Sequence, residues 1–374
     1  MDVKSLKIHF SQIERGEILK EIDEILNNGK LSQGDKVREF EEELVRYTGI
    51  ENAIAVNSGS SAIEMVMRIL GVKDKTVLIP TNTFLATASG VIFAGGKVKL
   101  LDTDPATFSV SLEEIKKKYT KDTAGVILVH IGGIITPELE AITKWCEEQN
   151  IWLFEDAAHA HGSTLNGKQA GSFGIAASYS LFATKVITCG EGGYILTNNN
   201  ELADKIRLYR NHGKKENWVT LHSSMGNNCR MSEIHAVIAK SQLKELNNII
   251  NERNQIASFY MNYFTAHLPE VKIIKPLEGT TNWYKYIVLL PEQVDREKLK
   301  RQLKEKGIYL PGEVYITPLH KQPIAKELGW MKEQLPYAET VCAKHVCLPI
   351  YKELEKQEME YVAKTFAEAV KKQM

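Results

Sequence analysis

The sequence lacks an excess of charge of either sign. Its 374 residues include 47 lysines and arginines against 47 aspartates and glutamates, so the formal net charge is zero. Nucleic acids and anionic membranes bind proteins largely through clustered positive charge, and the even balance gives no reason to expect either as a partner. Small molecules and other protein subunits are left as the candidate partners.

Paired cysteines and long apolar runs are also missing. The five cysteines are odd in number, widely spread and outside any Cys-x-x-Cys pair, which predicts free thiols and neither a disulfide framework nor a zinc site. The longest weakly polar stretch, residues 83–95, is too short and too rich in threonine and serine to span a membrane. The charged N-terminal segment lacks the apolar core of a signal peptide. We therefore expect a cytoplasmic protein without a metal site.

Alternating apolar and helical segments predict an α/β fold. Residues 20–48 have the pattern of two amphipathic helices broken at residues 28–34. Short apolar runs and helical segments then alternate, which is typical of a mostly parallel sheet covered by helices on both faces. The expected strands are residues 53–56, 76–80, 98–102, 125–130, 151–156 and 194–197.

The chain is too long for one ordinary domain, and the pattern changes beyond residue 200. Residues 200–260 are mostly helical and would connect two domains. A strand at 283–290 and helices at 295–306 and 354–372 indicate a smaller α+β unit. We expect a large three-layer α/β/α domain over residues 1–245, which includes the N-terminal helices, and a small C-terminal α+β domain over residues 246–374.

Three separate features have candidate roles in catalysis or binding. The segment NSGSSAIEMVM (57–67) follows an expected strand and opens a helix, so its N–H groups near Gly59 and Ser60 either hold a phosphate or belong to a plain serine-capped helix start. Asp156 ends an expected strand, at the edge where α/β sheets bind ligands. Lys185 lies among small residues before a glycine-rich turn. Each feature alone is more often structural than catalytic.

Together the three features meet the needs of pyridoxal phosphate chemistry. A lysine amine must form a Schiff base with the cofactor aldehyde and later move a proton. A carboxylate must keep the pyridine nitrogen protonated, so that the ring withdraws electrons. Helix N–H groups must hold the phosphate. Phe84, in PTNTFLATA (80–88), is a candidate for the aromatic face that stacks on the ring.

These motifs resemble those of the DegT/DnrJ sugar aminotransferases, which are fold-type I pyridoxal phosphate enzymes. The resemblance spans almost the whole chain and implies their fold for the large domain. The segments that carry it are EFEEELVRYTG (39–49), NSGSSA (57–62), PTNTFLATA (80–88), EDAAHAHG (155–162), GKQAGSFG (167–174), YSLFATKVITCGEGG (179–193), RNHG (210–213) and GNNCRMSEIHAVI (226–238).

The resemblance implies roles for individual residues. Lys185 would form the Schiff base, Asp156 would pair with the pyridine nitrogen, and His159 would contact the phenolic oxygen; the alternative for His159 is a hydrogen-bonded core histidine. Further contacts implied are Gly59, Ser60 and Ser180 at the phosphate, Phe84 on the ring, and Asn228 from a second subunit at the phosphate. A homodimer with shared active sites follows from the last contact. His320 is a candidate for a sugar contact, and His161 is expected to be structural.

The implied reaction is a ping-pong transamination. Glutamate would give its amino group to the cofactor, leaving pyridoxamine phosphate, which would then aminate a keto sugar, expected to be a nucleotide-linked keto-deoxysugar. One alternative is a pyridoxamine phosphate-dependent sugar dehydratase. The resemblance implies that such enzymes replace the Schiff-base lysine with histidine, so Lys185 argues against it. The other alternative is a cofactor-binding regulator without turnover.

Two segments depart from the family pattern near the expected substrate position. Many relatives have a VHLYGQ-like segment where this chain has VHIGGIITPE (129–138), and they have GYNYR where it has GNNCR (226–230). These differences leave open which keto sugar is used, which ring carbon is aminated and which pathway follows.

Overall fold

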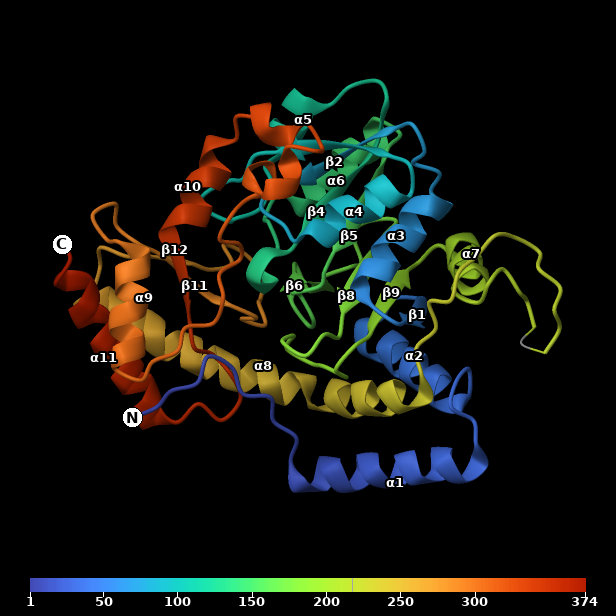
Figure 1. Cartoon of the computed structure of the whole chain (residues 1–374), viewed down its shortest axis with the longest axis horizontal. Coiled ribbons are helices and arrows are strands. Elements are labelled where there is room, and N and C mark those ends of the chain that lie inside the picture. Colours follow the sequence, from blue (N-terminus) through green and yellow to red (C-terminus); the bar gives the residue numbers. More distant parts are fainter. Residues whose placement is uncertain (217) are drawn as a thin grey trace.

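The computed structural model describes residues 1–216 and 218–374, and a seven-stranded sheet forms its centre (Figure 1). The strand order is β1-β9-β8-β5-β4-β2-β3. Strand β9 is antiparallel to both of its neighbours, whereas the remaining pairs are parallel. The strands are β1 (Asn52–Val56), β2 (Thr76–Pro80), β3 (Lys97–Leu101), β4 (Thr123–Val129), β5 (Trp152–Asp156), β8 (Ala176–Ser180) and β9 (Gly193–Thr197).

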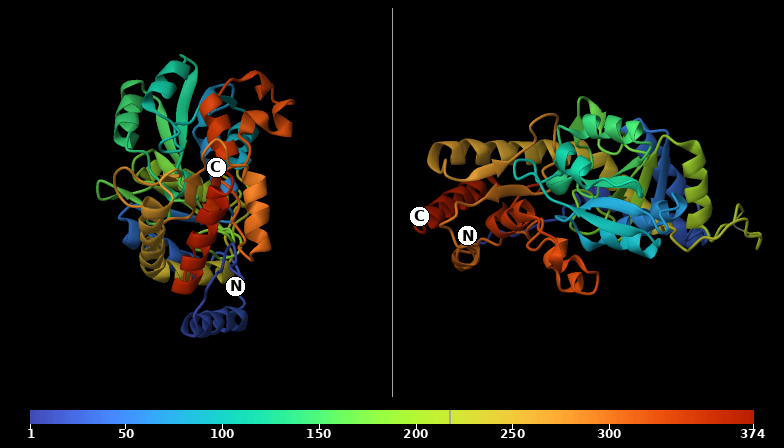
Figure 2. Two further views of the ribbon diagram at one scale, coloured as in Figure 1. Left: turned by 90° about the vertical axis from the view of Figure 1, so that its left-hand side faces the viewer. Right: turned by 90° about the horizontal axis from the view of Figure 1, so that it is seen from above.

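Helices cover both faces of this sheet. One face packs against α2 (Asp35–Thr48), α5 (Leu112–Lys118), α6 (Leu139–Glu148) and the first part of α8 (Glu233–His267). The other face packs against α3 (Gly59–Ile69), α4 (Leu85–Phe93) and α7 (Asn200–Arg210). Helix α1 (Gln12–Asn28) lies outside α8 (Figures 1 and 2).

Alternate residues of each strand contribute to opposite cores. In β5, Leu153 packs in the core under α2, α6 and α8, whereas Phe154 packs in the core under α3 and α4. In β4, Val126 and Ile127 divide in the same way. Successive side chains of a strand point to opposite faces, and both faces here are covered, so the strands are apolar at nearly every position. The three-layer arrangement predicted from the sequence is confirmed.

A second core lies at the end of the molecule away from α7 (Figures 1 and 2). It forms around a three-stranded antiparallel sheet and the second half of α8, with Tyr260, Phe264 and Phe366 among its largest buried side chains. Its elements are β10 (Lys272–Ile274), β11 (Tyr286–Leu289), β12 (His345–Leu348), α9 (Arg296–Glu305) and α11 (Lys356–Lys371), whereas α10 (Pro336–Lys344) packs in the first core through Val341 and Cys342. Helix α8 is continuous between the two cores, and the division of the chain at residue 245 stays a prediction.

Strand β8 is the main element that the sequence did not predict. Its residues AASYS are small or polar and lack an apolar run, yet β8 lies in the middle of the sheet between β5 and β9. Small residues are required because the start of α3 packs against its end: a Cβ added to Gly59 would lie 3.1 Å from the Cβ of Ser180. The other predicted strands and long helices are present, although α1 begins at Gln12 and not near residue 20.

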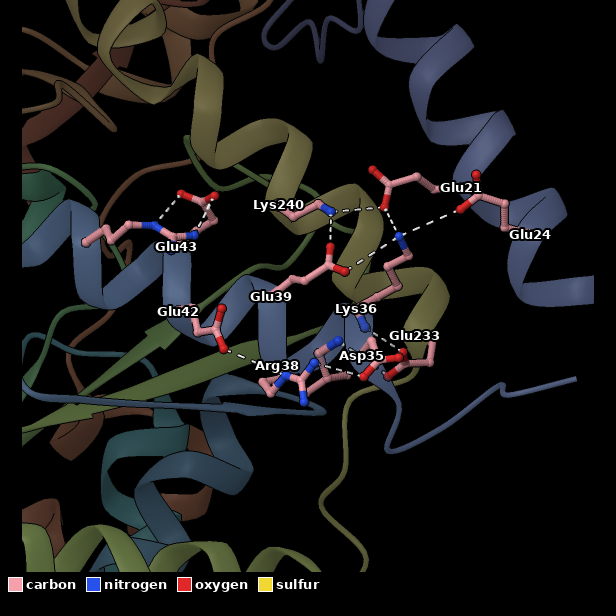
Figure 3. A network of polar contacts seen from close by, with 12 residues as sticks. Glu21, Glu24, Asp35, Lys36, Arg38, Glu39, Glu42, Glu43, Glu233 and Lys240 are labelled. Carbon is pink, nitrogen blue, oxygen red and sulfur yellow. Dashed lines mark hydrogen bonds and ion pairs between the residues drawn. The ribbon is translucent and has the colours of Figure 1, made fainter. Parts of the chain in front are cut away.

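A buried carboxylate of α8 caps the start of α2 (Figure 3). The N-cap residue Gly34 has no side chain to accept the free N–H groups of the helix. The Glu233 carboxylate takes this role, accepting the N–H groups of Gly34 at 2.9 Å, Lys36 at 2.8 Å and Val37 at 3.4 Å. A Cβ on Gly34 would lie 2.6 Å from Glu233 Oε2, so the approach requires glycine.

Ion pairs extend this contact to α1 (Figure 3). The Lys240 ammonium on α8 contacts Glu21 of α1 at 2.9 Å and also Glu39 of α2. Lys36 reaches the same Glu21 carboxylate at 2.8 Å. Helix α1 is therefore joined to the rest of the chain by polar contacts as well as by its apolar face.

Replacing Glu233 with alanine should lower the free energy of unfolding by about 2–3 kcal/mol, because three N–H groups at the start of α2 lose a charged acceptor. Urea unfolding measures the change. Glu201→Ala is the control: its side chain is 79% exposed and pairs only with Lys205 on the same helix, so its effect should stay below about 0.5 kcal/mol. Equal losses in the two variants would contradict the capping role.

Candidate active site

A cavity of about 480 Å³ opens beyond the carboxyl ends of the parallel strands. Val129 at the end of β4, Asp156 at the end of β5 and Ser180 at the end of β8 contribute to one wall. Residues 284–285, just before β11, and residues 312–315, after α9, form a second wall, where Tyr284 and Val314 pack in the same core as α2, α6 and the first part of α8. This is the position at which open α/β sheets bind ligands.

The adjacent acids Glu155 and Asp156 have different environments. Glu155 points to the face covered by α6 and α8, where its carboxylate forms a hydrogen bond with His130 Nε2 at 2.9 Å. The same carboxylate accepts hydrogen bonds from the backbone N–H groups of Gly171, Phe173 and Gly174. Asp156 points to the opposite face and lines the cavity. One acid therefore fixes a loop, and the other is available to a ligand.

Asp156 is held by two hydrogen bonds. Its Oδ2 accepts the hydroxyl of Thr87 on α4 at 2.8 Å, and its Oδ1 accepts the N–H of Ala158 at 3.2 Å. Burial raises the pKa of Asp156, whereas these two bonds and the positive charge of Lys185 act in the opposite direction. A cation bound next to this carboxylate would stabilise its ionised form further.

Lys185 carries a partly buried amine on the same cavity. Its Nζ lies 4.9 Å from the centroid of the Tyr284 ring. Burial lowers the pKa of Lys185 to about 8; the Asp156 carboxylate opposes this shift, and the Lys285 ammonium adds to it. A substantial fraction of this amine is therefore uncharged near neutral pH, which a nucleophilic lysine requires.

His159 lies between the two walls. Its ring stacks on Tyr284 with centroids 4.3 Å apart, and its Nε2 lies 3.4 Å from the hydroxyl of Tyr315. Burial, together with the nearby charge of Lys185, lowers the pKa of His159 well below its usual value. Because Nδ1 accepts the N–H of Gly132 at 3.3 Å, we assign the single ring proton to Nε2. Gly132 belongs to the segment that departs from the family pattern.

The start of α3 provides a site for an anion. Ser58 caps the helix by accepting the N–H of Ser61 at 3.1 Å. The N–H groups of Gly59 and Ser60 then have no acceptor within the helix, and both residues line the cavity together with Ser180. The expected phosphate contacts therefore lie side by side.

The remaining predicted residues divide into two groups. Phe84 lines the cavity, is 61% exposed and lies 6.2 Å from the Tyr315 ring, between centroids, so its face is accessible to a flat ligand. His320 is fully buried outside the cavity lining, bonded to Thr81 and Glu339. Asn228 is exposed and does not line the cavity of its own chain. The roles predicted for these three residues stay predictions.

Four residues that the sequence did not assign also contribute to the site: Thr87, Tyr284, Lys285 and Tyr315. Thr87 lies three residues after Phe84, in a motif that the sequence did single out. The other three come from a part of the chain more than 90 residues beyond Lys185, and no local spacing relates them to the motifs around it.

The site residues fit pyridoxal phosphate. Helix N–H groups are available for its phosphate, a buried carboxylate for its pyridine nitrogen, and a partly buried amine with a lowered pKa for its aldehyde. In residues 1–216 and 218–374, no group of three or more histidine, cysteine, aspartate or glutamate side chains is arranged to hold a metal ion. Within the same part of the chain, no helix has the length and apolar character needed to cross a membrane.

Known proteins match the chain over nearly its whole length. The DegT/DnrJ/EryC1/StrS aminotransferase family model matches residues 12–367. A UDP-4-amino-4,6-dideoxy-N-acetyl-beta-L-altrosamine transaminase of Campylobacter jejuni is 33% identical, covering 94% of this chain and 92% of its own. A pleiotropic regulatory protein of Geobacillus stearothermophilus is also 33% identical and covers 94% of each chain.

Solved structures show the same fold. Helicobacter pylori PseC, an aminotransferase involved in the biosynthesis of pseudoaminic acid, superposes with a TM-score of 0.92 over 100% of both chains at 24% identity. NtdA of Bacillus subtilis, solved with bound cofactor PMP, superposes with a TM-score of 0.91 over 99% of this chain and 85% of its own at 25% identity. This chain belongs to the DegT/DnrJ/EryC1/StrS aminotransferase family and is a pyridoxal phosphate-dependent aminotransferase.

Proposed function

We propose that the protein transfers an amino group from glutamate to a nucleotide-linked keto sugar, with Lys185 as the residue that bonds to the cofactor. The observation that carries the proposal is the meeting of Lys185, Asp156 and the start of α3 on one cavity. These groups come from separate elements of the sheet domain, and together they match the amine, carboxylate and phosphate-binding parts that the cofactor needs.

The residues that would hold the cofactor have distinct tasks. The N–H groups of Gly59 and Ser60, with the Ser180 hydroxyl, would bind its phosphate, and Asp156 would pair with its pyridine nitrogen. Phe84 would stack on the ring. When bound, the cofactor supplies an aldehyde that carries the amino group and a protonated ring that withdraws electrons from the reacting carbon.

Lys185 would transfer a proton during the reaction, and His159 would donate a hydrogen bond to the cofactor. Burial keeps the pKa of Lys185 near 8, so its Nζ can take a proton from the amino donor and return it to the acceptor without a large energy penalty in either direction. His159 is neutral and, through the proton on Nε2, would donate a hydrogen bond to the phenolic oxygen. The two walls of the cavity limit the access of water to these groups.

A sugar acceptor is supported by the names of the relatives. The Campylobacter jejuni relative is named for a UDP-linked amino sugar. The dehydratase alternative is disfavoured by Lys185 itself. The regulatory alternative draws support from the name of the Geobacillus stearothermophilus relative, but the proposed catalytic residues are all present here.

A homodimer with shared sites is supported by the segment that follows α7. This segment projects from the molecule (Figures 1 and 2) and exposes large apolar side chains, including Trp218, Leu221 and Met225. Asn228 lies at its end, exposed, where a second copy could bring it to the neighbouring cavity. A cytoplasmic location also stays a prediction; the five cysteines are all buried free thiols.

Two half-reactions test the proposed function. Cofactor-loaded protein mixed with glutamate should lose the absorption of the aldehyde form, and a nucleotide-linked keto sugar should restore it. Lys185→Ala should lose turnover by at least about 10³-fold, because both the covalent bond and the proton transfer depend on this amine. Turnover of Lys185→Ala at the parent rate would disprove the assignment. Failure of every keto sugar to restore the absorption would favour the regulatory alternative.

The pH dependence of cofactor attachment reports the state of Lys185. Only the neutral amine attacks an aldehyde, so the rate of attachment to the cofactor-free protein should rise with pH and level off above about pH 8. An unperturbed lysine would keep rising toward about pH 10.4. Stopped-flow absorption at a series of pH values distinguishes the two profiles, with the Lys185→Arg variant as the control for non-specific attachment.

Mixed dimers test whether the sites are shared. Lys185→Ala and Asn228→Asp subunits should each be inactive alone, because one lacks the amine and the other brings a negative charge to the phosphate. Co-expressed in equal amounts, they should recover roughly one quarter of the parent activity, since half of the dimers are mixed and each mixed dimer contains one complete site. No recovery in isolated mixed dimers would place Asn228 outside the neighbouring site.

A further inference from the structure

Five charged side chains line the cavity, and four of them are accounted for. Asp156 and Lys185 belong to the proposed cofactor contacts. Glu313 is paired through Oε1 with Lys300, whose Nζ lies at 2.7 Å; its side chain is 1% exposed, and its Oε2 has no hydrogen-bond partner among the described residues. Glu191 is exposed to solvent in the glycine-rich turn. The fifth is Lys285.

Lys285 is a partly buried cation without an acidic partner. None of the ion pairs among residues 1–216 and 218–374 involves it, and its closest recorded contact is the Tyr284 ring, whose centroid lies 5.3 Å from its Nζ. Burial lowers the pKa of Lys285, while the Cys347 thiol and, more weakly, the Glu313 carboxylate favour its charged form. A desolvated ammonium group gains most from an anion that arrives with a ligand.

The position of Lys285 limits which anion this can be. Its Nζ and that of Lys185 lie 5.3 Å and 4.9 Å from the centroid of the same tyrosine ring, so the two nitrogens are at most 10.2 Å apart, the sum of these two distances, which is within the span of a small molecule bound at the reacting amine. In an α-amino acid, the carboxylate oxygens lie within about 3.6 Å of the amino nitrogen. In a nucleotide-linked sugar whose reacting carbon is C3 or C4, two or more ring bonds and the glycosidic oxygen separate the diphosphate from that carbon.

We propose that Lys285 binds the α-carboxylate of the amino donor. This inference rests on the proposed function, in which the donor amine takes the place of Lys185 on the cofactor. It assigns the donor carboxylate to the wall formed by residues 284–285 and 312–315, and not to the sheet edge that carries the proposed cofactor contacts. Tyr284 would position both ammonium groups through its ring face.

Binding of the donor carboxylate to Lys285 would also raise the pKa of Lys185. The positive charge of Lys285 is one of the influences that lower the pKa of Lys185. Neutralising that charge would make the Lys185 amine a stronger base once the donor has arrived, when it must accept a proton.

The glutamate half-reaction of the cofactor-loaded protein tests the assignment. In Lys285→Met, the glutamate concentration that gives the half-maximal rate should rise about 10- to 100-fold, because a charge-assisted contact is lost. Lys285→Arg, which keeps the charge, should recover most of the affinity. The sugar half-reaction, started from the amino form of the cofactor, should change by less than about twofold.

A donor analogue separates this role from a structural one. Glutamate α-amide lacks the carboxylate, so the parent protein should prefer glutamate to this analogue, and Lys285→Met should lose the preference. A second readout needs no donor: the pH midpoint for cofactor attachment to Lys185 should move upward in Lys285→Met, because a nearby positive charge is gone.

Unchanged glutamate dependence in Lys285→Met would overturn the proposal. A loss confined to the sugar half-reaction would also overturn it and assign Lys285 to the sugar substrate. If the parent protein does not react with glutamate at all, the proposed function has failed instead.

Discussion

The site depends on the two-residue period of a single strand. Glu155 and Asp156 are neighbours at the end of β5, so their side chains must point to opposite faces of the sheet. Glu155 orders the loop at residues 171–174 through three backbone N–H groups, and Asp156 faces the cavity from the side covered by α3 and α4. A shift of one residue would turn Asp156 away from the cavity and remove Glu155 from the loop that it orders. The paired acids therefore have different tasks, one in ordering a loop and the other in lining the cavity.

Burial shifts the pKa values of three groups of the cavity toward their neutral forms. It raises the pKa of Asp156 and lowers those of Lys185 and His159. For Lys185 and His159 this suits the proposed chemistry, which needs a nucleophilic amine and a neutral imidazole. For Asp156 burial opposes the ionised form, and the Thr87 and Ala158 hydrogen bonds offset only part of the penalty. A positively charged pyridine ring next to Asp156 would stabilise the ionised carboxylate further. The ionised form of Asp156 is therefore more stable with the cofactor bound than in the empty cavity.

The sequence predicted the parts of the site that depend on local chemistry. Short apolar runs identified six of the sheet strands, and its position at a strand end singled out Asp156, which lines the cavity. Strand β8 was not predicted because it has no apolar run: its residues are small because the start of α3 packs against its end. The sequence did not identify the wall formed by Tyr284, Lys285 and Tyr315 for another reason. Those residues belong to the C-terminal part of the chain and reach Lys185 only through tertiary packing, which no spacing in the sequence predicts.

The long helix α8 links the two sheets. The proposed cofactor contacts lie at the edge of the large sheet, whereas Tyr284 and Lys285 directly precede β11 of the three-stranded sheet, so the distance between Lys185 and Tyr284 depends on how the two sheets are held together. Helix α8 contributes to both cores as one unbroken 35-residue element. Glu233 caps α2 from the first turn of α8, and Lys240 joins α8 to α1 and α2. These contacts far from the cavity fix the position of α8 and thereby help to keep both ammonium groups at the Tyr284 ring.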